Sequence, residues 1–257
     1  MCFDDDGQPP AFPGVVRGTE QSDLVLTAAD GGAYRAVLAR PTASMPADPD
    51  SAVLILPDGR GLHPYYERMA ARLASVGIPA LAIDTYGRTA GIGARPADFT
   101  SGDHSAALLW ETVQLDLAAG VTQLRAALPG RPLVTMGFCL GGRIALLAAT
   151  MPALGLAGTI AFYPGVHGPA RSDLPAPDGV AGTLCCPVLS LFGGADELIP
   201  PEHVDAWQAA LSTSPMPGDV VVYPGAPHSF FDRRADDFTE ESDDAAARCL
   251  AFLNNPG

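Results

Sequence analysis

The sequence MGFCLGGR, residues 136–143, decides the expected fold of this 257-residue chain. It follows a short apolar run over residues 132–136, which predicts a strand, and it opens a helical pattern over residues 140–149. Cys139 has a glycine two residues before it and another two residues after it. A nucleophile at such a strand-to-helix turn defines a nucleophile elbow, here with cysteine in place of serine. Glycine is required because side chains on either side of this strained turn would collide.

This turn predicts a reactive thiol. An elbow exposes its central side chain above the carboxyl end of the strand, at a helix N-terminus whose partial positive charge favours a thiolate. The backbone N–H of Leu140 would then face an oxyanion. The competing interpretation is a buried cysteine in a tight glycine turn.

An elbow also needs a general base and an acid that orients it, in the chain order nucleophile, acid, histidine. Asp196 follows the predicted strand at residues 187–192, and His228 follows the predicted strand at residues 220–223. Loops at the carboxyl ends of parallel strands converge at one edge of the sheet. We therefore expect His228 to take the proton of Cys139 while Asp196 sets the tautomer of the histidine.

Two further strand-end loops belong to the predicted site. The segment PDGRG, residues 57–61, follows the first expected parallel strand, and Gly59 is expected to supply the second oxyanion N–H. Asp58 and Arg60 would lie at the rim. The segment DTYGR, residues 84–88, places Tyr86 and Arg88 near the same cleft. Arg88 would bind a substrate carboxylate with two hydrogen bonds, the alternative being a structural salt bridge.

Short apolar runs alternate with helical patterns along most of the chain. This alternation predicts an α/β fold with a mostly parallel sheet of about eight strands, helices on both faces and an antiparallel N-terminal hairpin. The predicted strands cover residues 24–27, 34–38, 52–56, 78–83, 132–136, 156–162, 187–192 and 220–223. The predicted helices cover residues 65–76, 105–128, 140–149, 203–211 and 238–253.

The domain organisation is expected to be simple. No repeat or shift in composition marks a boundary, so residues 1–20 are interpreted as an N-terminal extension and residues 21–257 as a single domain. Residues 84–103 form a long predicted loop. Residues 166–182 are an irregular excursion, and whether it acts as a lid is open. Oligomeric state is not predicted.

Composition excludes several classes of protein. The formal net charge is −14, which argues against partners such as nucleic acid or an anionic membrane surface. The N-terminus has no secretory pattern, and no apolar run is long enough to span a bilayer. The five cysteines suit neither a disulfide framework nor a zinc site, so a reducing cytoplasmic location is expected. No metal is expected, because the remaining histidines share no ligand spacing (His63, His104, His167 and His203).

At this point the chain resembles the dienelactone hydrolase family, which has the α/β-hydrolase fold. The resemblance extends over about residues 54–233 and is carried by GFCLGGR, AFYPG, LFGGADELIPPE and YPGAPHSFFDR. It implies a Cys–His–Asp hydrolase of enol-lactones or small esters that needs no cofactor, with Cys139, His228 and Asp196 in those roles. It also implies that Arg88 matches a family arginine that binds a substrate carboxylate.

Two positions depart from the family pattern. Asp58 stands where the dienelactone enzymes have a glutamate that helps to control ionisation of the thiol, and it is one methylene shorter. Asp232 stands where a second carboxylate-binding arginine is expected, and Arg233 follows one residue later. The carboxylate pocket, and with it the substrate, is therefore open.

The predicted function is hydrolysis of a lactone or small ester through a thioester, and whether the substrate bears a carboxylate is left open. Two alternatives stay open. The first is general esterase or acyltransferase chemistry on the same three residues. The second is a non-catalytic protein in which Cys139 is a redox-sensing or binding thiol.

Overall fold

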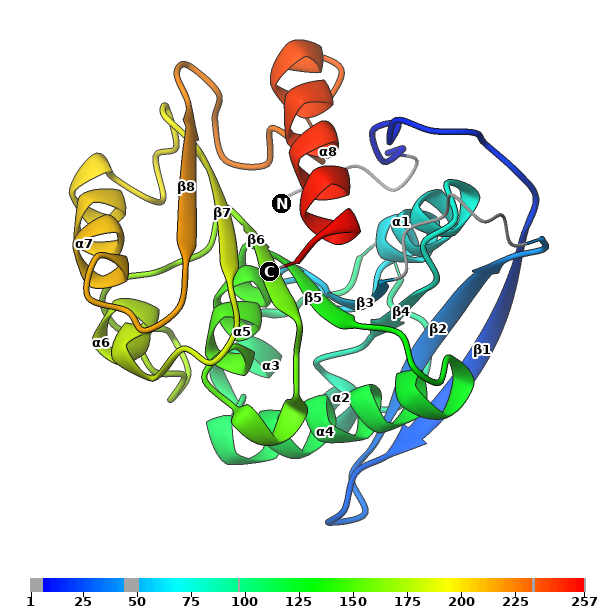
Figure 1. Ribbon diagram of the computed structural model, residues 1–257. Helices are drawn as coiled ribbons and strands as arrows, with labels where there is room; N and C mark the ends of the chain where they lie inside the picture. The colour runs from blue at the N-terminus through cyan, green and yellow to red at the C-terminus, as the bar shows by residue number, and fades with distance from the viewer. Residues whose placement is uncertain (1–6, 44–50, 97, 233, 257) are drawn as a thin grey trace.

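The computed structural model describes residues 7–43, 51–96, 98–232 and 234–256, and within them eight strands form one twisted sheet (Figure 1). The order across the sheet is β1-β2-β4-β3-β5-β6-β7-β8. The β1–β2 and β2–β4 pairs are antiparallel and all the other pairs are parallel. The strands are β1 (Thr19–Thr27), β2 (Ala33–Pro41), β3 (Ala52–Leu56), β4 (Ala80–Ile83), β5 (Leu133–Phe138), β6 (Gly158–Phe162), β7 (Val188–Gly193) and β8 (Gly218–Tyr223).

Helices cover both faces of this sheet. In Figure 1, α1 and α8 lie on one face, and α4 and α5 lie on the other. The helices are α1 (Pro64–Ser75), α2 (Gly87–Ala90), α3 (Gly102–Ala106), α4 (Trp110–Ala127), α5 (Leu140–Ala148), α6 (Pro177–Val180), α7 (Pro201–Leu211) and α8 (Thr239–Asn254), with short 3-10 turns η1 (Pro152–Leu154) and η2 (Ala181–Thr183). The predicted mostly parallel sheet with an antiparallel N-terminal hairpin is confirmed.

The central strands are apolar because helices bury them from both sides. Every residue of β3 and β5 is buried, which is why these runs show no alternation between apolar and polar positions. On α4, Val113, Leu117, Val121 and Leu124 are buried, whereas Leu109, expected on the same stripe, precedes the helix and is exposed. Gly120 on the same helix brings the backbone of α4 close to β3, because a Cβ there would lie 3.2 Å from the side chain of Leu54.

Several element boundaries differ from the sequence-based prediction. The predicted helix over residues 105–128 is divided into α3 and α4. The division lies where the Asp173 carboxylate accepts a 2.6 Å hydrogen bond from the Trp110 N–H and so caps α4. That cap comes from a segment 63 residues away, so the local helical pattern contained no sign of it. The predicted loop at residues 84–103 contains the short helix α2.

The N-terminal hairpin is longer than predicted and begins inside the predicted extension. β1 starts at Thr19 and pairs with β2 as far as Thr27. Phe12, which precedes it, is buried and contacts Phe231 with an edge-to-face ring geometry. Residues of the predicted extension thus pack on the domain, and the division at residue 20 stays a prediction.

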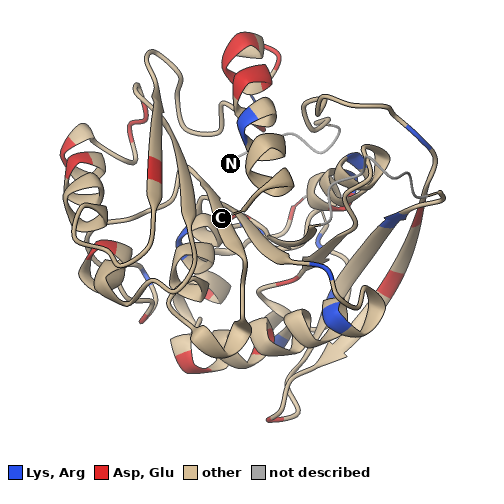
Figure 2. Cartoon of the chain, viewed as in Figure 1, with Lys and Arg blue, Asp and Glu red and all other residues tan. Residues whose placement is uncertain are grey.

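Among the described residues, the acidic side chains belong to several elements. In Figure 2, acidic residues mark α7, α8 and β1 among other elements, and basic residues are fewer. All 15 basic residues are arginines, against 29 acidic residues.

The glycines around Cys139 allow β5 and α5 to approach each other and β3 closely. A Cβ on Gly137 would overlap the carbonyl oxygen of Gly141, and a Cβ on Gly141 would overlap the carbonyl oxygen of Leu56. Both obstacles are backbone atoms of buried elements, which have little room to move. The elbow therefore depends on the absence of side chains at these two positions.

We predict that Gly141→Ala lowers the free energy of unfolding by about 3 kcal/mol or more, because the added methyl overlaps buried backbone. Urea denaturation measures the loss. Gly182→Ala is the matched control, because a Cβ at that position meets nothing within 4 Å; its stability should be unchanged or slightly raised. Equal stability of the two variants would contradict this account of the elbow.

Candidate active site

Cys139 occupies a strained turn between β5 and α5. Its φ and ψ are 52° and −111°, and it is the N-cap residue of α5. A non-glycine residue in this region costs on the order of 1–3 kcal/mol, so the surrounding fold must hold it there. Its N–H donates a 3.0 Å hydrogen bond to the carbonyl of Phe162, which anchors the turn to β6. Cys139 is partly exposed and lines a cleft, so it is not sealed in the core.

A histidine and an aspartate from two neighbouring strand-end loops form a close pair. The Nδ1 atom of His228 lies 2.7 Å from Oδ2 of Asp196. The other oxygen of Asp196 accepts hydrogen bonds from the N–H groups of Leu198 (2.8 Å) and Ile199 (3.2 Å), and the Asp196 side chain is only 1% exposed. Because an ionised carboxylate only accepts, this arrangement places the proton on Nδ1 and leaves Nε2 as the basic nitrogen.

The thiol and the imidazole line a single cleft of about 440 Å³. Asp196 is hydrogen-bonded to the imidazole but does not line the cleft. The cleft brings together four residues that the sequence placed in the site: Cys139, Leu140, Gly59 and His228. The other lining residues are Ser101, Gly102, Ser105, Arg143, Tyr163, Gly165, Ala170, Arg171, Ser172, Leu198 and Ile199.

Gly59, in the loop after β3, lines the cleft, and hydrogen bonds to residues outside the cleft hold this loop in place. The carboxylate of Asp58 accepts a 2.8 Å hydrogen bond from the N–H of Arg60. The hydroxyl of Tyr86 donates a 2.9 Å hydrogen bond to the carbonyl of Gly59. Burial, followed by the nearby charge of Asp58, raises the pKa of Tyr86, so this hydroxyl stays a donor. Leu62 N–H is in turn held by Asp84 at 2.9 Å.

Asp58 and Arg60 at the rim and Tyr86 near the cleft were candidates for binding substrate, and none of the three lines the cleft. Asp58 is fully buried, and Arg60 is 7% exposed. Tyr86 is also fully buried. In this geometry the three residues shape the Gly59 loop.

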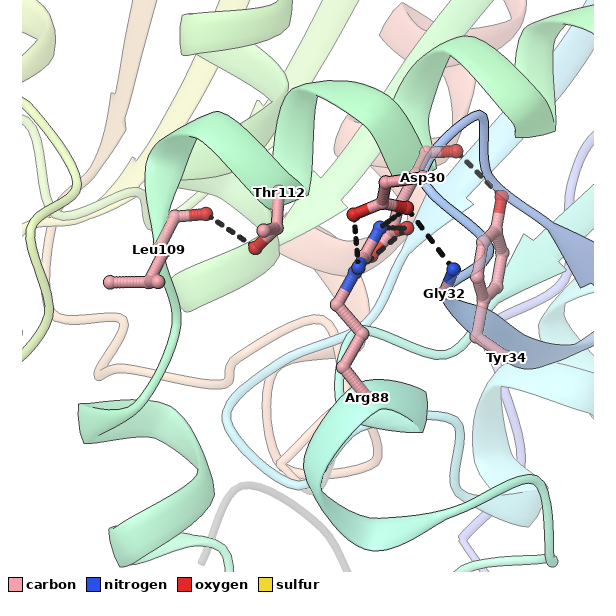
Figure 3. Close-up of polar contacts among 7 residues, drawn as sticks. Asp30, Gly32, Tyr34, Arg88, Leu109 and Thr112 are labelled. Carbon is pink, nitrogen blue, oxygen red and sulfur yellow. Dashed lines mark hydrogen bonds and ion pairs between the residues drawn. The ribbon is translucent and has the colours of Figure 1, made fainter.

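Arg88 requires a correction, because it does not line the cleft. Its guanidinium lies between Asp116 on α4 and Asp30 in the β1–β2 turn (Figure 3). The Arg88 nitrogens lie 2.8 Å and 2.9 Å from the oxygens of Asp116 and 2.7 Å and 2.9 Å from those of Asp30. Gly32 makes room for it, since a Cβ there would overlap the guanidinium. The structural salt bridge is therefore the correct alternative. Arg233 lies outside the described residues.

Sequence reasoning missed the role of Arg143, although it lies in the decisive motif. This arginine is 5% exposed and binds backbone carbonyls of the excursion at residues 166–182 and of the residue before it. The acceptors are Pro175 (2.9 Å), Gly165 (3.2 Å), Gly168 (2.9 Å) and Leu174 (3.0 Å). The excursion is thereby held against α5 as one wall of the cleft. No local signal predicts this role, because the acceptors are main-chain atoms that any sequence would carry.

Arg171, on that same wall, is a second feature that sequence reasoning missed. It is exposed and lines the cleft. Within the described part of the chain, its guanidinium forms no hydrogen bond or ion pair. Arg143, the other arginine lining the cleft, is already bonded to carbonyls. Arg171 is therefore the cleft guanidinium available to an anion.

Metal ligation has no candidate among the residues that the structure describes, where no cluster of three or more His, Cys, Asp or Glu side chains is suited to an ion. His167 instead pairs with Asp178 at 2.5 Å, and His104 lies 2.9 Å from the hydroxyl of Thr89. Over the same described residues, no helix has the length and apolar character needed to cross a bilayer.

The sheet order, the strained cysteine turn and the strand-end His–Asp pair define an α/β-hydrolase. Among solved structures, the "Putative Dienelactone Hydrolase" from Klebsiella pneumoniae is 25% identical, with a TM-score of 0.74 over 93% of this chain and 100% of that one. The dienelactone hydrolase family model matches residues 34–255. The chain therefore belongs to the dienelactone hydrolase family, as its motifs predicted.

Two curated relatives share the name "Putative carboxymethylenebutenolidase". The Salmonella typhimurium protein is 32% identical over 222 residues, which are 83% of this chain and 79% of that protein. The Yersinia pestis protein is 39% identical over 130 residues, so the match spans about half of each chain, 49% and 48%. The predicted class of enzyme, a dienelactone hydrolase-like hydrolase, agrees with these relatives.

The Arg88 bridge predicts a specific dependence of stability on pH. The Arg88 guanidinium lowers the pKa of Asp30 from 3.8 to about 2. A carboxyl group with a lower pKa in the folded state contributes stability that is present above pH 3.8 and is lost as the pH falls through about 2. In urea unfolding between pH 5 and pH 2, Asp30→Asn should lose less stability than the wild type.

Asp219→Asn is the control for this experiment, because its exposed carboxylate makes no ion pair among the described residues. That variant should follow the wild-type curve. Parallel curves for wild type and Asp30→Asn would show that the bridge does not perturb Asp30.

Proposed function

We propose that this protein hydrolyses a lactone or a small carboxylic ester, with Cys139 as nucleophile, His228 as base and then acid, and Asp196 as the group that orients His228. The observation that carries the proposal is the shared cleft: the thiol and the imidazole line it together, and Asp196 holds the far nitrogen of that imidazole. A redox-sensing thiol would need neither partner. The relatives' printed name, which refers to a butenolide, supports a lactone as substrate.

In the first half of the reaction, Nε2 of His228 takes the proton of the Cys139 thiol as the sulfur attacks the acyl carbonyl carbon. The carbonyl oxygen becomes an oxyanion that accepts hydrogen bonds from the N–H groups of Leu140 and Gly59, each worth roughly 3 kcal/mol in comparable sites. As the tetrahedral intermediate collapses, the C–O bond breaks and the imidazolium protonates the leaving oxygen. The product is a thioester; from a lactone, the new hydroxyl stays attached to the acyl chain.

In the second half, water completes the hydrolysis. His228 removes a proton from a water molecule as its oxygen attacks the thioester carbonyl. The second tetrahedral intermediate expels the Cys139 sulfur, which recovers a proton from the imidazolium, and a carboxylic acid leaves. Both halves use the same base and the same oxyanion donors, so one cleft serves both.

The charge of the cleft indicates which lactones or esters would bind best. With a formal net charge of −14, the protein as a whole repels anions, and Arg171 is the cleft guanidinium without a partner among the described residues. An ester with a carboxylate on its acyl or alcohol part would gain a charge-assisted hydrogen bond there. This proposal replaces the expectation that Arg88 binds the carboxylate.

We predict that Cys139→Ala abolishes turnover of every lactone and short ester that the wild type hydrolyses, because no nucleophile is left. His228→Ala and Asp196→Asn should lower kcat by about 10²-fold or more. The assay is product release over a panel of lactones and p-nitrophenyl esters, with mass spectrometry of quenched samples to detect an acyl group on Cys139. Retention of activity in Cys139→Ala would refute the mechanism. Transfer of the acyl group to an added alcohol at rates above hydrolysis would favour an acyltransferase.

We also predict that Arg171→Gln raises KM about 10-fold for a p-nitrophenyl hemisuccinate but changes KM less than 2-fold for the neutral methyl succinate analogue, because a charge-assisted contact is worth about 1.5–3 kcal/mol. Arg88→Gln is the control and should leave both KM values unchanged. Equal effects of Arg171→Gln on the two esters would show that Arg171 does not select charge.

A further inference from the structure

Tyr163 is a buried side chain whose place beside His228 the mechanism above does not explain. It follows β6 directly, its φ is 35°, and it is fully buried while still lining the cleft. Its ring centroid lies 4.8 Å from that of His228, with the planes tilted by 55°. The two rings are therefore in contact on one side of the imidazole.

The hydroxyl of Tyr163 is held by a residue of the histidine loop itself. It donates a 2.6 Å hydrogen bond to Oδ2 of Asp232, which is 3% exposed and lies four residues after His228. The turn between them is tight: Ser229 has a φ of 64°, and its carbonyl accepts a 3.2 Å hydrogen bond from the Asp232 N–H. Burial and then the charge of Asp232 raise the pKa of Tyr163, so the phenol remains a donor.

His228, Asp232 and Tyr163 are thus linked to one another. The turn connects His228 to Asp232, a hydrogen bond connects Asp232 to Tyr163, and the ring of Tyr163 packs on the imidazole. The backbone of Tyr163 is fixed independently, since its N–H donates a 2.7 Å hydrogen bond to Leu191 of β7. A residue in the left-handed region persists only where its surroundings over-determine it. The Asp232 bond and the β7 bond meet that requirement.

The contact with Tyr163 restrains the orientation of the His228 ring in a way that the bond to Asp196 does not. The 2.7 Å bond at Nδ1 fixes one point of the imidazole, about which the ring can still swing. A packed ring on one side removes that freedom and keeps Nε2 aimed at the cleft. Misplacement of a reacting group by about 1 Å can cost as much as 10²-fold in rate, so such a restraint has consequences for turnover.

We propose that the Tyr163–Asp232 pair is a positioning clamp for His228, acting through the imidazole and never touching substrate with its hydrogen-bonded groups. The inference rests on the proposed function, because it assigns the clamp to the base of that reaction. It also gives Asp232 a role in this chain: a carboxylate at that position accepts from a buried phenol instead of facing an anionic substrate.

The experiment compares two tyrosine-to-aspartate hydrogen bonds in the same chain. Tyr163→Phe removes the clamp bond and keeps the ring, and Asp232→Ala removes it from the other side. The matched control is Tyr223→Phe, because the hydroxyl of Tyr223 donates a 2.9 Å bond to Asp244 and its ring does not line the cleft. Asp232→Asn is the conservative variant, since its amide oxygen can still accept from Tyr163.

We expect Tyr163→Phe and Asp232→Ala to lower kcat about 10-fold or more with KM within about 2-fold, since only the placement of the base changes. Asp232→Asn should retain turnover within about 3-fold, and combining Tyr163→Phe with Asp232→Ala should cost little beyond either change alone. Tyr223→Phe should lower the melting temperature without lowering kcat. A kcat for Tyr163→Phe equal to that of Tyr223→Phe would overturn the clamp.

A second readout does not depend on turnover of any ester. The rate of iodoacetamide alkylation of Cys139, followed by peptide mass spectrometry from pH 5 to pH 9, reports how well the imidazole assists the thiol. Among the described residues, the charged or titratable groups near the imidazole include Cys139, Asp196, Asp232 and Tyr163.

In Tyr163→Phe the alkylation midpoint should move to higher pH, whereas in Tyr223→Phe it should not. Unchanged profiles in folded Tyr163→Phe and Asp232→Ala would refute the clamp. If Cys139→Ala still turned over esters, the proposed function would fail, while the alkylation profiles would still decide whether the clamp exists.

Discussion

The left-handed backbone at Cys139 is the constraint on which the rest of the site depends. Cys139 can adopt that conformation at the end of β5 only if the residues two positions away have no side chains. Backbone atoms of α5 and β3 occupy the space that a Cβ on Gly137 or Gly141 would need. The close approach in turn brings the first turn of α5 against the carboxyl ends of β3 and β6. Leu140 and Gly59, whose N–H groups we propose as oxyanion donors, line one cleft.

Strain is concentrated at this same edge of the sheet. Within the described residues, positive φ values at non-glycine positions occur at Cys139, Tyr163 and Ser229, which belong to the ends of β5 and β6 and to the loop after β8. Each such residue costs on the order of 1–3 kcal/mol. The buried central strands and the helices on both faces supply the stability that offsets this cost. The strained residues of the site therefore lie at one edge of the sheet, where the surrounding packing holds them in place.

Three arginines of this acidic chain bind groups within the protein. Arg143 binds four carbonyls and so holds the excursion as a cleft wall, and Arg88 bridges the hairpin turn to α4. Arg95 pairs with the buried carboxylate of Asp84, which also holds the Gly59 loop through Leu62. The planar guanidinium suits these tasks because its five donors reach several acceptors at once. Of the two arginines that line the cleft, Arg143 is thus bonded to carbonyls, and Arg171 is the one that can face a ligand.

What the sequence by itself determined is local or ordered along the chain. Glycine spacing around Cys139 specifies the elbow, and the order of Cys139, Asp196 and His228 after three strands places them at one edge, because parallel strands end on the same side. The tertiary structure alone decided where long side chains point. Arg88 follows β4 as predicted, but it lies in the short helix α2, and its guanidinium reaches partners 58 and 28 residues away. The cap of α4 likewise comes from a distant residue, Asp173. A flexible side chain goes to the acceptors that folding brings near, and those acceptors have no fixed spacing in the sequence.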